Sequence, residues 1–337
     1  MLSRFGVILL ITAHPARALS MDRTEIVKVE EPFCKSVRVS PLRDLVFVET
    51  RSKLHIFKEE NMKVVSCLDL MNEAYEARWF PFQTETEAAL AASMNNRPVA
   101  MYNGWTGEHI CSYVPMNHVE VLDAPVSFDF TVQGQLVCGG FECLRTFDVQ
   151  RPGRDHDLFK LSPFRRSKDG LKGRVAMVSV RKDMSSLAAI STFAKNTFAL
   201  VDLRAQEFVF QSQGNVGTVR QAEFSTDGWG MFTYSRHHES IKYWDLRTVS
   251  VVKEIPRTSC RTNQKMLFDV FGSWIAFGNC TGHVQIFDYI EDKIVFESKE
   301  EQGVANCVSF SSENTLWTSF GDRRHIGHVK KINFKEL

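Results

Sequence analysis

The chain has 337 residues, of which 44% are hydrophobic, and its 41 Lys and Arg residues almost balance its 40 Asp and Glu residues. A net charge of +1 excludes a protein that binds nucleic acid through an overall positive field, although a local basic surface stays open. No segment approaches the roughly 18 consecutive apolar residues of a membrane-spanning helix, so we expect no such helix and no membrane partner.

The first twenty residues carry an apolar segment that we place outside the fold. Residues 5–13 (FGVILLITA) follow a short basic start. Two interpretations stay open. The segment is a secretory signal peptide, in which case the glycosylation sequon Asn279-Cys280-Thr281 would matter, or it reflects an upstream start codon and the working protein begins at Met21. We therefore divide the chain into an extension, 1–20, and a single domain, 21–337.

Along that domain, a short apolar segment ends seven times in a bulky residue followed by Asp, Asn or Lys. The intervals between these pairs are 45, 45, 54, 43, 43 and 45 residues. A period of this length with an aromatic–Asp signature is typical of the WD40 β-propeller. The fifth unit shows the expected blade, with strands at 219–224, 229–234, 241–244 and 249–255 separated by polar turns. The seven pairs are Phe57-Lys58, Tyr102-Asn103, Phe147-Asp148, Val201-Asp202, Trp244-Asp245, Phe287-Asp288 and Ile332-Asn333.

The seventh unit is incomplete, because only four residues follow Ile332-Asn333. An unpaired sheet edge would favour aggregation. The alternating segment 25–29 (EIVKV) precedes the first unit and has the pattern of the missing strand. The sequence therefore predicts an all-β, seven-bladed WD40 β-propeller closed by an N-terminal strand.

Basic residues are concentrated in two stretches. Residues 145–182 contain eleven Lys and Arg against four Asp and Glu, and residues 322–336 contain five against two. The first stretch includes an insertion, Pro163–Arg174 (PFRRSKDGLKGR), which accounts for the 54-residue interval. Insertions in repeat proteins map to loops and often to the binding face.

In a WD40 blade, the turn between the second and third strands and the linker to the next blade open on the same face. Cations on that face would suit phosphate contacts, and Phe164 inside the insertion could stack on a base. The alternative for each cation is an ordinary solvated loop residue. The candidate RNA-contact residues are Arg51, Arg97, Phe164, Arg165, Arg166, Lys168, Lys172, Arg236, His237, Arg323 and Arg324.

The segment Trp244-Asp245-Leu246-Arg247 has two interpretations. As structure, the Asp closes a turn and the Trp packs between blades. As function, a Trp-Asp-x-Arg segment is used by propellers that dock on the adaptor of cullin-type ubiquitin ligases. Trp244, Asp245 and Arg247 are therefore candidate adaptor-docking residues, and a substrate receptor or scaffold for such a ligase is the alternative function.

Enzyme motifs are missing from the sequence: it contains no GxSxG, GxxxxGK[ST], GxGxxG or HExxH. We therefore expect no catalysis, no cofactor and no small-molecule substrate. The eight cysteines include no CxxC pair, so we expect no metal site. A chain of this size has no need of a disulfide framework, so we expect reduced and mostly buried thiols.

Residues 138–155 (CGGFECLRTFDVQRPGRD) combine a Gly-rich turn, an Arg-x-Phe strand and Arg151-Pro152-Gly153-Arg154-Asp155. This segment resembles the third blade of the telomerase Cajal body protein family, which are WD40 proteins. Residues 103–108 (NGWTGE) and 243–247 (YWDLR) are similar too. A Pro-Gly turn with flanking Arg and Asp also has a purely structural explanation. By blade topology, the motif lies between the third and fourth strands, opposite the basic candidates.

The resemblance implies a non-catalytic protein that recognises a short box in the terminal loop of small nuclear RNAs. These are box H/ACA-type Cajal-body RNAs and, in the family, telomerase RNA, and the protein directs their ribonucleoproteins to Cajal bodies. The resemblance also implies folding on the cytosolic chaperonin, in keeping with a propeller's many non-local strand pairings. We therefore expect an RNA-binding propeller in the nucleus and its Cajal bodies, with secretion as the alternative if residues 1–20 are a signal peptide.

Overall fold

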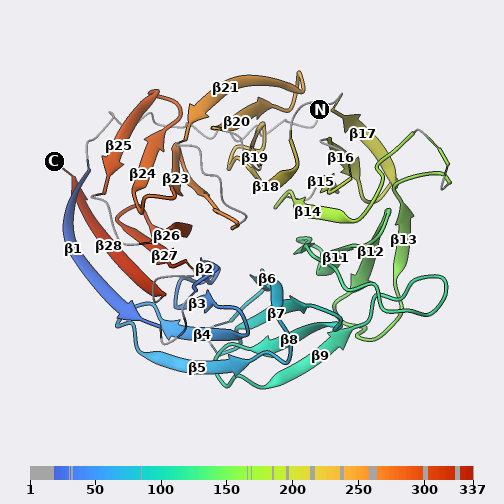
Figure 1. Ribbon diagram of the computed structural model, residues 1–337, viewed down its shortest axis with the longest axis horizontal. Coiled ribbons are helices and arrows are strands. Elements are labelled where there is room, and N and C mark those ends of the chain that lie inside the picture. The colour runs from blue at the N-terminus through green and yellow to red at the C-terminus, as the bar shows by residue number, and fades with distance from the viewer. Residues whose placement is uncertain are drawn as a thin grey trace, which may run out of the picture.

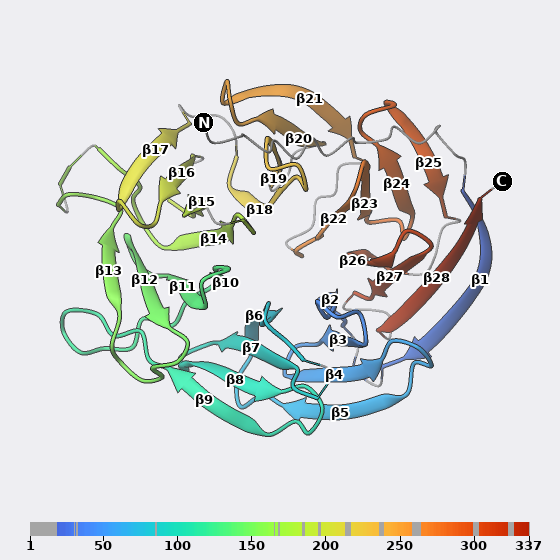
Figure 2. The same ribbon diagram turned by 180° about the vertical axis from the view of Figure 1, so that it is seen from behind.

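The computed structural model describes residues 19–336, except 30, 32, 85, 165, 168, 184–185, 195–196, 213–216, 236–238, 258–263, 299–302 and 323–326. In this part of the chain, strands form seven four-stranded antiparallel sheets that are arranged in a ring, as Figure 1 and, from behind, Figure 2 show. The seven-bladed β-propeller predicted from the repeat is thereby confirmed. No helix of the described residues is long and apolar enough to cross a membrane.

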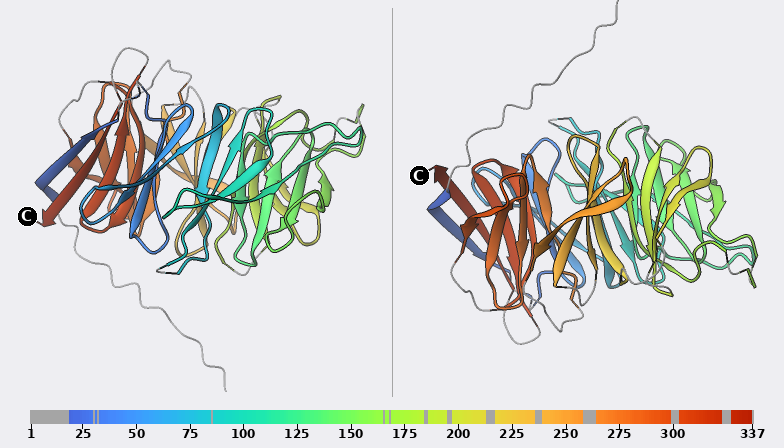
Figure 3. Two further views of the ribbon diagram at one scale, coloured as in Figure 1. Left: turned by 90° about the horizontal axis from the view of Figure 1, so that it is seen from below. Right: turned by 90° about the horizontal axis from the view of Figure 1, so that it is seen from above.

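Each blade runs from an innermost strand at the centre of the ring to an outermost strand at its edge, and the side views of Figure 3 show the sheets standing next to one another. Blade 1 consists of β2 (Ser36–Val39), β3 (Leu45–Glu49), β4 (Lys53–Lys58) and β5 (Val64–Asp69). Blade 2 consists of β6 (Ala74–Trp79), β7 (Ala89–Met94), β8 (Val99–Asn103) and β9 (His109–Tyr113). Blade 3 consists of β10 (Phe128–Phe130), β11 (Gln135–Gly139), β12 (Cys143–Asp148) and β13 (Asp157–Lys160).

The remaining blades follow the same order, and the last of them takes its outermost strand from the start of the chain. Blade 4 consists of β14 (Val175–Val180), β15 (Leu187–Thr192), β16 (Phe198–Asp202) and β17 (Glu207–Gln211), and blade 5 of β18 (Val219–Phe224), β19 (Gly230–Ser235), β20 (Ser240–Asp245) and β21 (Ser250–Pro256). Blade 6 consists of β22 (Asp269–Phe271), β23 (Trp274–Gly278), β24 (Val284–Asp288) and β25 (Lys293–Glu297). Blade 7 consists of β26 (Ala305–Ser312), β27 (Thr315–Phe320), β28 (His328–Glu336) and β1 (Leu19–Lys28).

The repeated residue pairs have a direct physical explanation. The bulky member is buried in six of the seven pairs, as Phe147 and Val201 are, and Tyr102 is partly buried. In blades 2 to 6 the polar member, an Asp or Asn, closes the turn to the outermost strand, because its side-chain oxygen accepts backbone N–H groups two or three residues on. Asp202 Oδ1 accepts from Arg204 and Ala205 at 2.8 and 3.0 Å, and Asp288 Oδ1 does the same for Ile290 and Glu291. Asp and Asn favour such turns.

The buried apolar side chains of the described residues form seven clusters, one at each junction between neighbouring blades. At the junction of blades 1 and 2, the rings of Phe47 and Trp79 lie 5.5 Å apart, and Trp79 Nε1 donates to the Arg38 carbonyl at 2.9 Å. Because the ring is closed, every sheet is covered on both faces, and this explains why most strand residues are buried.

The N-terminal closure strand is also confirmed. β1 pairs antiparallel with β28 from Leu19↔Glu336 to Lys28↔His328, with one irregularity between Met21 and Arg23. The strand begins at Leu19, so two residues of the segment that we place outside the fold take part in it. The apolar segment at residues 5–13 lies outside the described residues.

One described cysteine departs from the expectation of reduced thiols. Among the described residues six cysteines are free, and four of these, Cys34, Cys138, Cys143 and Cys307, are buried. Cys280 is disulfide-bonded, so the expectation of reduced thiols throughout is wrong there. The sequence gives no signal for this, since Cys280 belongs to no local cysteine pair.

Candidate nucleic-acid interface

Two long linkers shape the surface where the RNA-contact residues are expected. Residues 114–127 join β9 to β10, and residues 161–174 join β13 to β14. Both project from the edge of the ring beside blade 3 in Figure 1. The second contains the predicted insertion, Pro163–Arg174. We call the face formed by the interblade linkers and by the turns between second and third strands the linker face.

The insertion is held together by one of its own cations. Lys172 is largely buried, and its Nζ donates to Ser162 Oγ and, at 2.8 Å, to the Phe164 carbonyl. It also lies 3.8 Å from Glu142 Oε2 in the β11–β12 turn. Gly170 has φ +77° and passes so close to the Leu161 carbonyl that a Cβ atom would clash. Lys172 therefore shapes the loop, and its charge is engaged within the protein.

The other described candidates are more accessible. Phe164 is 65% exposed, and Arg97 and Arg166 are exposed as well. Arg51 is exposed, with its Nε 3.7 Å from Glu73. The remaining candidates, Arg165, Lys168, Arg236, His237, Arg323 and Arg324, lie outside the described residues. The structure thus places Phe164, Arg166 and Lys172 in one linker, and Arg51 and Arg97 in turns of blades 1 and 2.

An ion-pair cluster that sequence reasoning missed joins the two long linkers. Asp123 in the first linker is buried between two arginines: Arg145 Nη1 donates to its Oδ2 at 2.8 Å, and Arg174 Nη1 lies 2.9 Å from its Oδ1. Arg145 is buried too, and its Nε donates to the Met116 carbonyl at 3.0 Å. We call Asp123, Arg145 and Arg174 the Asp123 clamp. These residues are 22 to 51 positions apart, so no local pattern could reveal them.

The basic stretch 145–182 does not form one surface. Arg145 is buried in the clamp, and Lys182 follows β14, where its Nζ donates to Asp129 Oδ1 and the Phe130 carbonyl, each at 2.7 Å. Blade topology puts Lys182 at the opposite end of the strand from Arg174. Net charge along the sequence therefore overstates the charge available on any one face.

The Arg151–Asp155 motif lies in the turn between β12 and β13, as predicted. Gly153, with φ +122°, donates its N–H to the Ser112 carbonyl at 3.0 Å and accepts from Val114 N at 2.7 Å. The motif therefore contacts the end of β9, where the first long linker begins. In Figure 1, β9 runs along the edge of the ring towards β12 and β13. Pro152, Arg154 and Asp155 are exposed.

The structural interpretation accounts for two of the three adaptor-docking candidates. Trp244 is buried, packs edge-on against Phe198 with ring centres 4.9 Å apart, and donates from Nε1 to Thr233 Oγ1. Asp245 accepts the Arg247 backbone N–H at 2.9 Å and two hydrogen bonds from its guanidinium. These bonds lower the pKa of Asp245 to about 2. Arg247 itself stays 64% exposed over the ring of Trp229.

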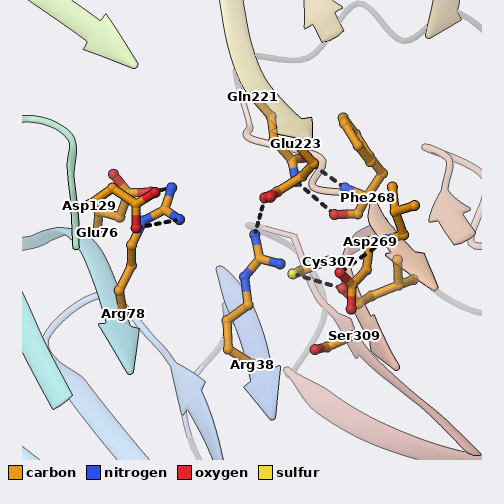
Figure 4. A network of polar contacts seen from close by, with 12 residues as sticks. Arg38, Glu76, Arg78, Asp129, Gln221, Glu223, Phe268, Asp269, Cys307 and Ser309 are labelled. Carbon is orange, nitrogen blue, oxygen red and sulfur yellow. Dashed lines mark hydrogen bonds and ion pairs between the residues drawn. The ribbon is translucent and has the colours of Figure 1, made fainter. Parts of the chain in front are cut away.

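A second group of charged residues lines the centre of the ring (Figure 4). Arg78 Nη2 donates to Glu76 Oε1 at 3.0 Å, and its Nη1 lies 3.5 Å from Asp129 Oδ1. Arg38 Nη2 lies 3.9 Å from Glu223 Oε1. We call Arg38, Arg78 and the carboxylates around them (Glu76, Asp129, Glu223 and Asp269) the channel network.

Burial dominates the electrostatics of the channel network. It raises the pKa of Asp269 to about 6, although Arg38 works in the opposite direction. Burial would also raise the pKa of Asp129, but Arg78 and Lys182 hold it below its usual value. Because the channel arginines face carboxylates, the channel is a poor site for RNA phosphates. Within the described part of the chain, no group of three or more His, Cys, Asp and Glu residues is placed to hold a metal ion.

With this geometry in place, comparison with known proteins supports the family resemblance. The chain is similar to telomerase Cajal body proteins. It is 24% identical over 293 residues to the telomerase Cajal body protein 1 homolog of Drosophila melanogaster, covering 84% of this chain and 49% of that protein. It is 26% identical over 220 residues to telomerase Cajal body protein 1 of Mus musculus, covering 64% and 40%.

A third relative has a different name. The guanine nucleotide-binding protein negative regulator 1 of Schizosaccharomyces pombe is 24% identical over 260 residues, covering 74% of this chain and 64% of that protein. No protein-family model matches the chain. The chain spans about half or less of the length of the first two relatives.

Proposed function

We propose that this propeller binds small RNAs of the box H/ACA Cajal-body type, with telomerase RNA as a further candidate, and directs their ribonucleoproteins to Cajal bodies without catalysing a reaction. The observation that carries the proposal is the second long linker, which presents Phe164 and Arg166 together at the surface. Similarity to proteins named for telomerase and Cajal bodies supports it.

The physical argument concerns what an RNA loop requires. Unpaired bases stack on aromatic rings, and arginines contact phosphates without reading sequence. Arg97 and Arg166 are exposed at the linker face, whereas the arginines of the channel network face carboxylates. The linker face is therefore the surface of the described residues best suited to a structured RNA.

Crosslinking the full chain to RNA in cells, followed by sequencing, tests the proposal. We expect small nuclear RNAs of the box H/ACA type to be recovered above background, and a fluorescent fusion of the full chain to accumulate in Cajal bodies. Recovery of no small nuclear RNA would refute RNA binding. A diffuse fusion that still crosslinks to these RNAs would refute only the targeting step.

Charge reversal locates the surface. The double variant R97E/R166E should weaken binding of a box H/ACA-type RNA at least tenfold at about 100 mM salt, and the affinity of the natural protein should fall steeply between 50 and 200 mM salt, because neutralised phosphates release counterions. The matched control is R23E/R204E, which changes two exposed arginines away from the linker face. Equal losses in both variants would mean that only net charge matters.

Folding on the cytosolic chaperonin belongs to the same proposal. The non-local closure of β1 on β28 requires almost the whole chain to be made before the ring can close, and non-local pairing slows folding. Newly synthesised full chain should co-purify with the chaperonin and leave it within minutes. A chain that folds at the same rate without chaperonin would contradict this part.

Docking on a cullin-ligase adaptor is a second candidate, because Arg247 is exposed beside the exposed ring of Trp229. If this surface docks, R247A should abolish co-purification of the adaptor while leaving RNA crosslinking unchanged. Absence of the adaptor from a pulldown of the natural protein would exclude the candidate.

A further inference from the structure

Three phenylalanines around the Asp123 clamp expose their rings to solvent. Phe141 is 59% exposed, Phe164 is 65% exposed and Phe193 is 41% exposed. Two of them, Phe141 and Phe193, lie in turns between the second and third strands of blades 3 and 4, where sequence reasoning named no contact residue. Large aromatic side chains are normally the most valuable for the core, so several exposed ones on one face indicate an interaction surface.

Backbone contacts place these rings around one arginine. Phe141 and Arg174 are partners in an isolated antiparallel bridge, and the Phe193 N–H donates to the Arg174 carbonyl at 3.0 Å. Arg174 therefore lies between the two turns. Phe164 is connected to the same place through Lys172, which binds the Phe164 carbonyl and pairs with Glu142, the neighbour of Phe141.

Cations accompany the rings. The guanidinium of Arg220 lies 4.8 Å from the centre of the Phe193 ring, and Arg174 is partly exposed. The carboxylates that contact this region are already engaged, because Asp123 is buried between two arginines and Glu142 pairs with Lys172. Aromatic rings interleaved with arginines are the pattern of single-stranded nucleic-acid sites, in which bases stack and cations follow the backbone.

The clamp fixes the position of Phe141. The Phe141 N–H donates to Asp123 Oδ2 at 2.9 Å. The preceding residue, Gly140, has no room for a side chain, since a Cβ atom there would lie 2.6 Å from Asp123 Oδ2 and closer still to Arg145 Nη1. A rigidly held turn presents its ring at little cost in conformational entropy when a ligand binds.

We propose that Phe141, Phe164 and Phe193, with Arg174 and Arg220 beside them, form a stacking platform for unpaired RNA bases. The proposal rests on the proposed function and assigns its base contacts, which the arginines of the wider linker face do not provide. A protein partner is the competing occupant, because aromatic residues and arginines also gather in protein interfaces. RNA is favoured because the two carboxylates that contact this region, Asp123 and Glu142, are already engaged by cations of the fold.

Equilibrium binding of the full chain to two RNAs tests the platform: a box H/ACA-type RNA with an unpaired terminal loop, and the same stem closed into a fully paired duplex. F141A/F193A should weaken binding of the looped RNA about thirtyfold, because each stacked base contributes roughly tenfold or less. Binding of the duplex should stay unchanged, and so should the salt slope, because no charge is removed. F141Y/F193Y should bind within about threefold of the natural protein, since tyrosine also stacks.

The matched control is F82A, which removes an exposed phenylalanine from the turn between the first and second strands of blade 2, on the opposite face. Equal melting temperatures of all variants would show that they fold. If F141A/F193A binds the looped RNA like the natural protein while R97E/R166E does not, the platform is wrong and the proposed function stands. If the natural protein binds neither RNA, the proposed function fails. Loss of a protein partner, with RNA binding intact, would also overturn the platform.

Discussion

The stacking platform and the channel network use arginine in opposite ways. In the channel, Arg38 and Arg78 lie among carboxylates on the innermost strands, and Arg78 is within 3.5 Å of both Glu76 and Asp129. On the platform, Arg220 covers an aromatic ring, and Arg174 shares a single buried carboxylate with Arg145. The channel arginines therefore lie among carboxylates, whereas Arg220 lies over an exposed ring and Arg174, although paired with Asp123, keeps 38% of its side chain exposed.

This difference also determines which substitutions each region can tolerate without loss of stability. Breaking a buried ion pair leaves an uncompensated charge in a poorly solvated place and costs several kcal/mol. Removing an exposed ring or cation costs the fold little. The two regions should therefore respond oppositely to substitution, the channel in stability and the platform in binding.

The largest effect is expected from R78A. Without Arg78, Glu76 and Asp129 lose their shared cation, although Asp129 keeps Lys182. The free energy of unfolding in urea should fall by about 3 kcal/mol. The RNA affinity of the folded fraction should stay unchanged. R97A, at an exposed arginine of the linker face, is the control and should change stability by less than about 0.5 kcal/mol. A stability loss below about 1 kcal/mol in R78A would show that the channel arginines are not structural.

A smaller but mixed effect is expected from R145A, because Arg145 supports the platform through the Asp123 clamp without being part of the platform. Asp123 would keep Arg174, so unfolding should become easier by about 2 kcal/mol, in the range for a lost hydrogen bond to a charged group. The Phe141 turn would lose support, so binding of the looped RNA should weaken too. R174A also removes a bond to Asp123 and one to the Ala124 carbonyl, but the Arg174 side chain is 38% exposed, so its stability loss should be smaller than that of R145A and its binding loss larger. Identical behaviour of the two variants would remove the distinction between support and contact.

Most of the fold could be predicted from the sequence, because the residues that mark the ends of strands act locally. Each repeat carries its own turn chemistry, so residues such as Asp202 and Asp288 mark where a third strand ends. The predicted strand 219–224 coincides with β18, and the other strands expected in that blade differ by one residue at their ends. The closure by β1 followed from counting strands.

Less of the candidate site could be predicted from the sequence, because its contacts join residues that lie far apart in the chain. Lys172 looks like a free cation until Ser162 and Glu142 are brought to it by the fold. Phe141 and Phe193 look like core residues in the sequence, and only their position just past a strand end distinguishes them from buried phenylalanines such as Phe147. Asp123 lies in a linker with no motif, and its two arginines come from β12 and from the other linker.

The smallest expected effect is a dependence of stability on pH, which arises in the channel network and not on the platform. Burial raises the pKa of Asp269 to about 6, above the value near 3.9 of an unfolded chain. Between about pH 4 and 6, the native state therefore holds a proton that the unfolded state has lost, so this group's contribution to stability falls as pH rises through that window.

In D269N this contribution disappears, and the stability of the variant relative to the natural protein should rise from pH 4 to pH 7. The amide cannot accept from both Phe310 and Val270, as the carboxylate does, so the variant also loses a constant amount that does not depend on pH. The change with pH in the difference between the two free energies of unfolding therefore tests the prediction, and the constant part of that difference does not. Titration of the Asp269 carboxyl carbon by NMR measures the pKa directly. A midpoint near 4 would mean that water reaches this end of the channel freely, and that the channel and the linker face differ less in solvation than their ion pairs indicate.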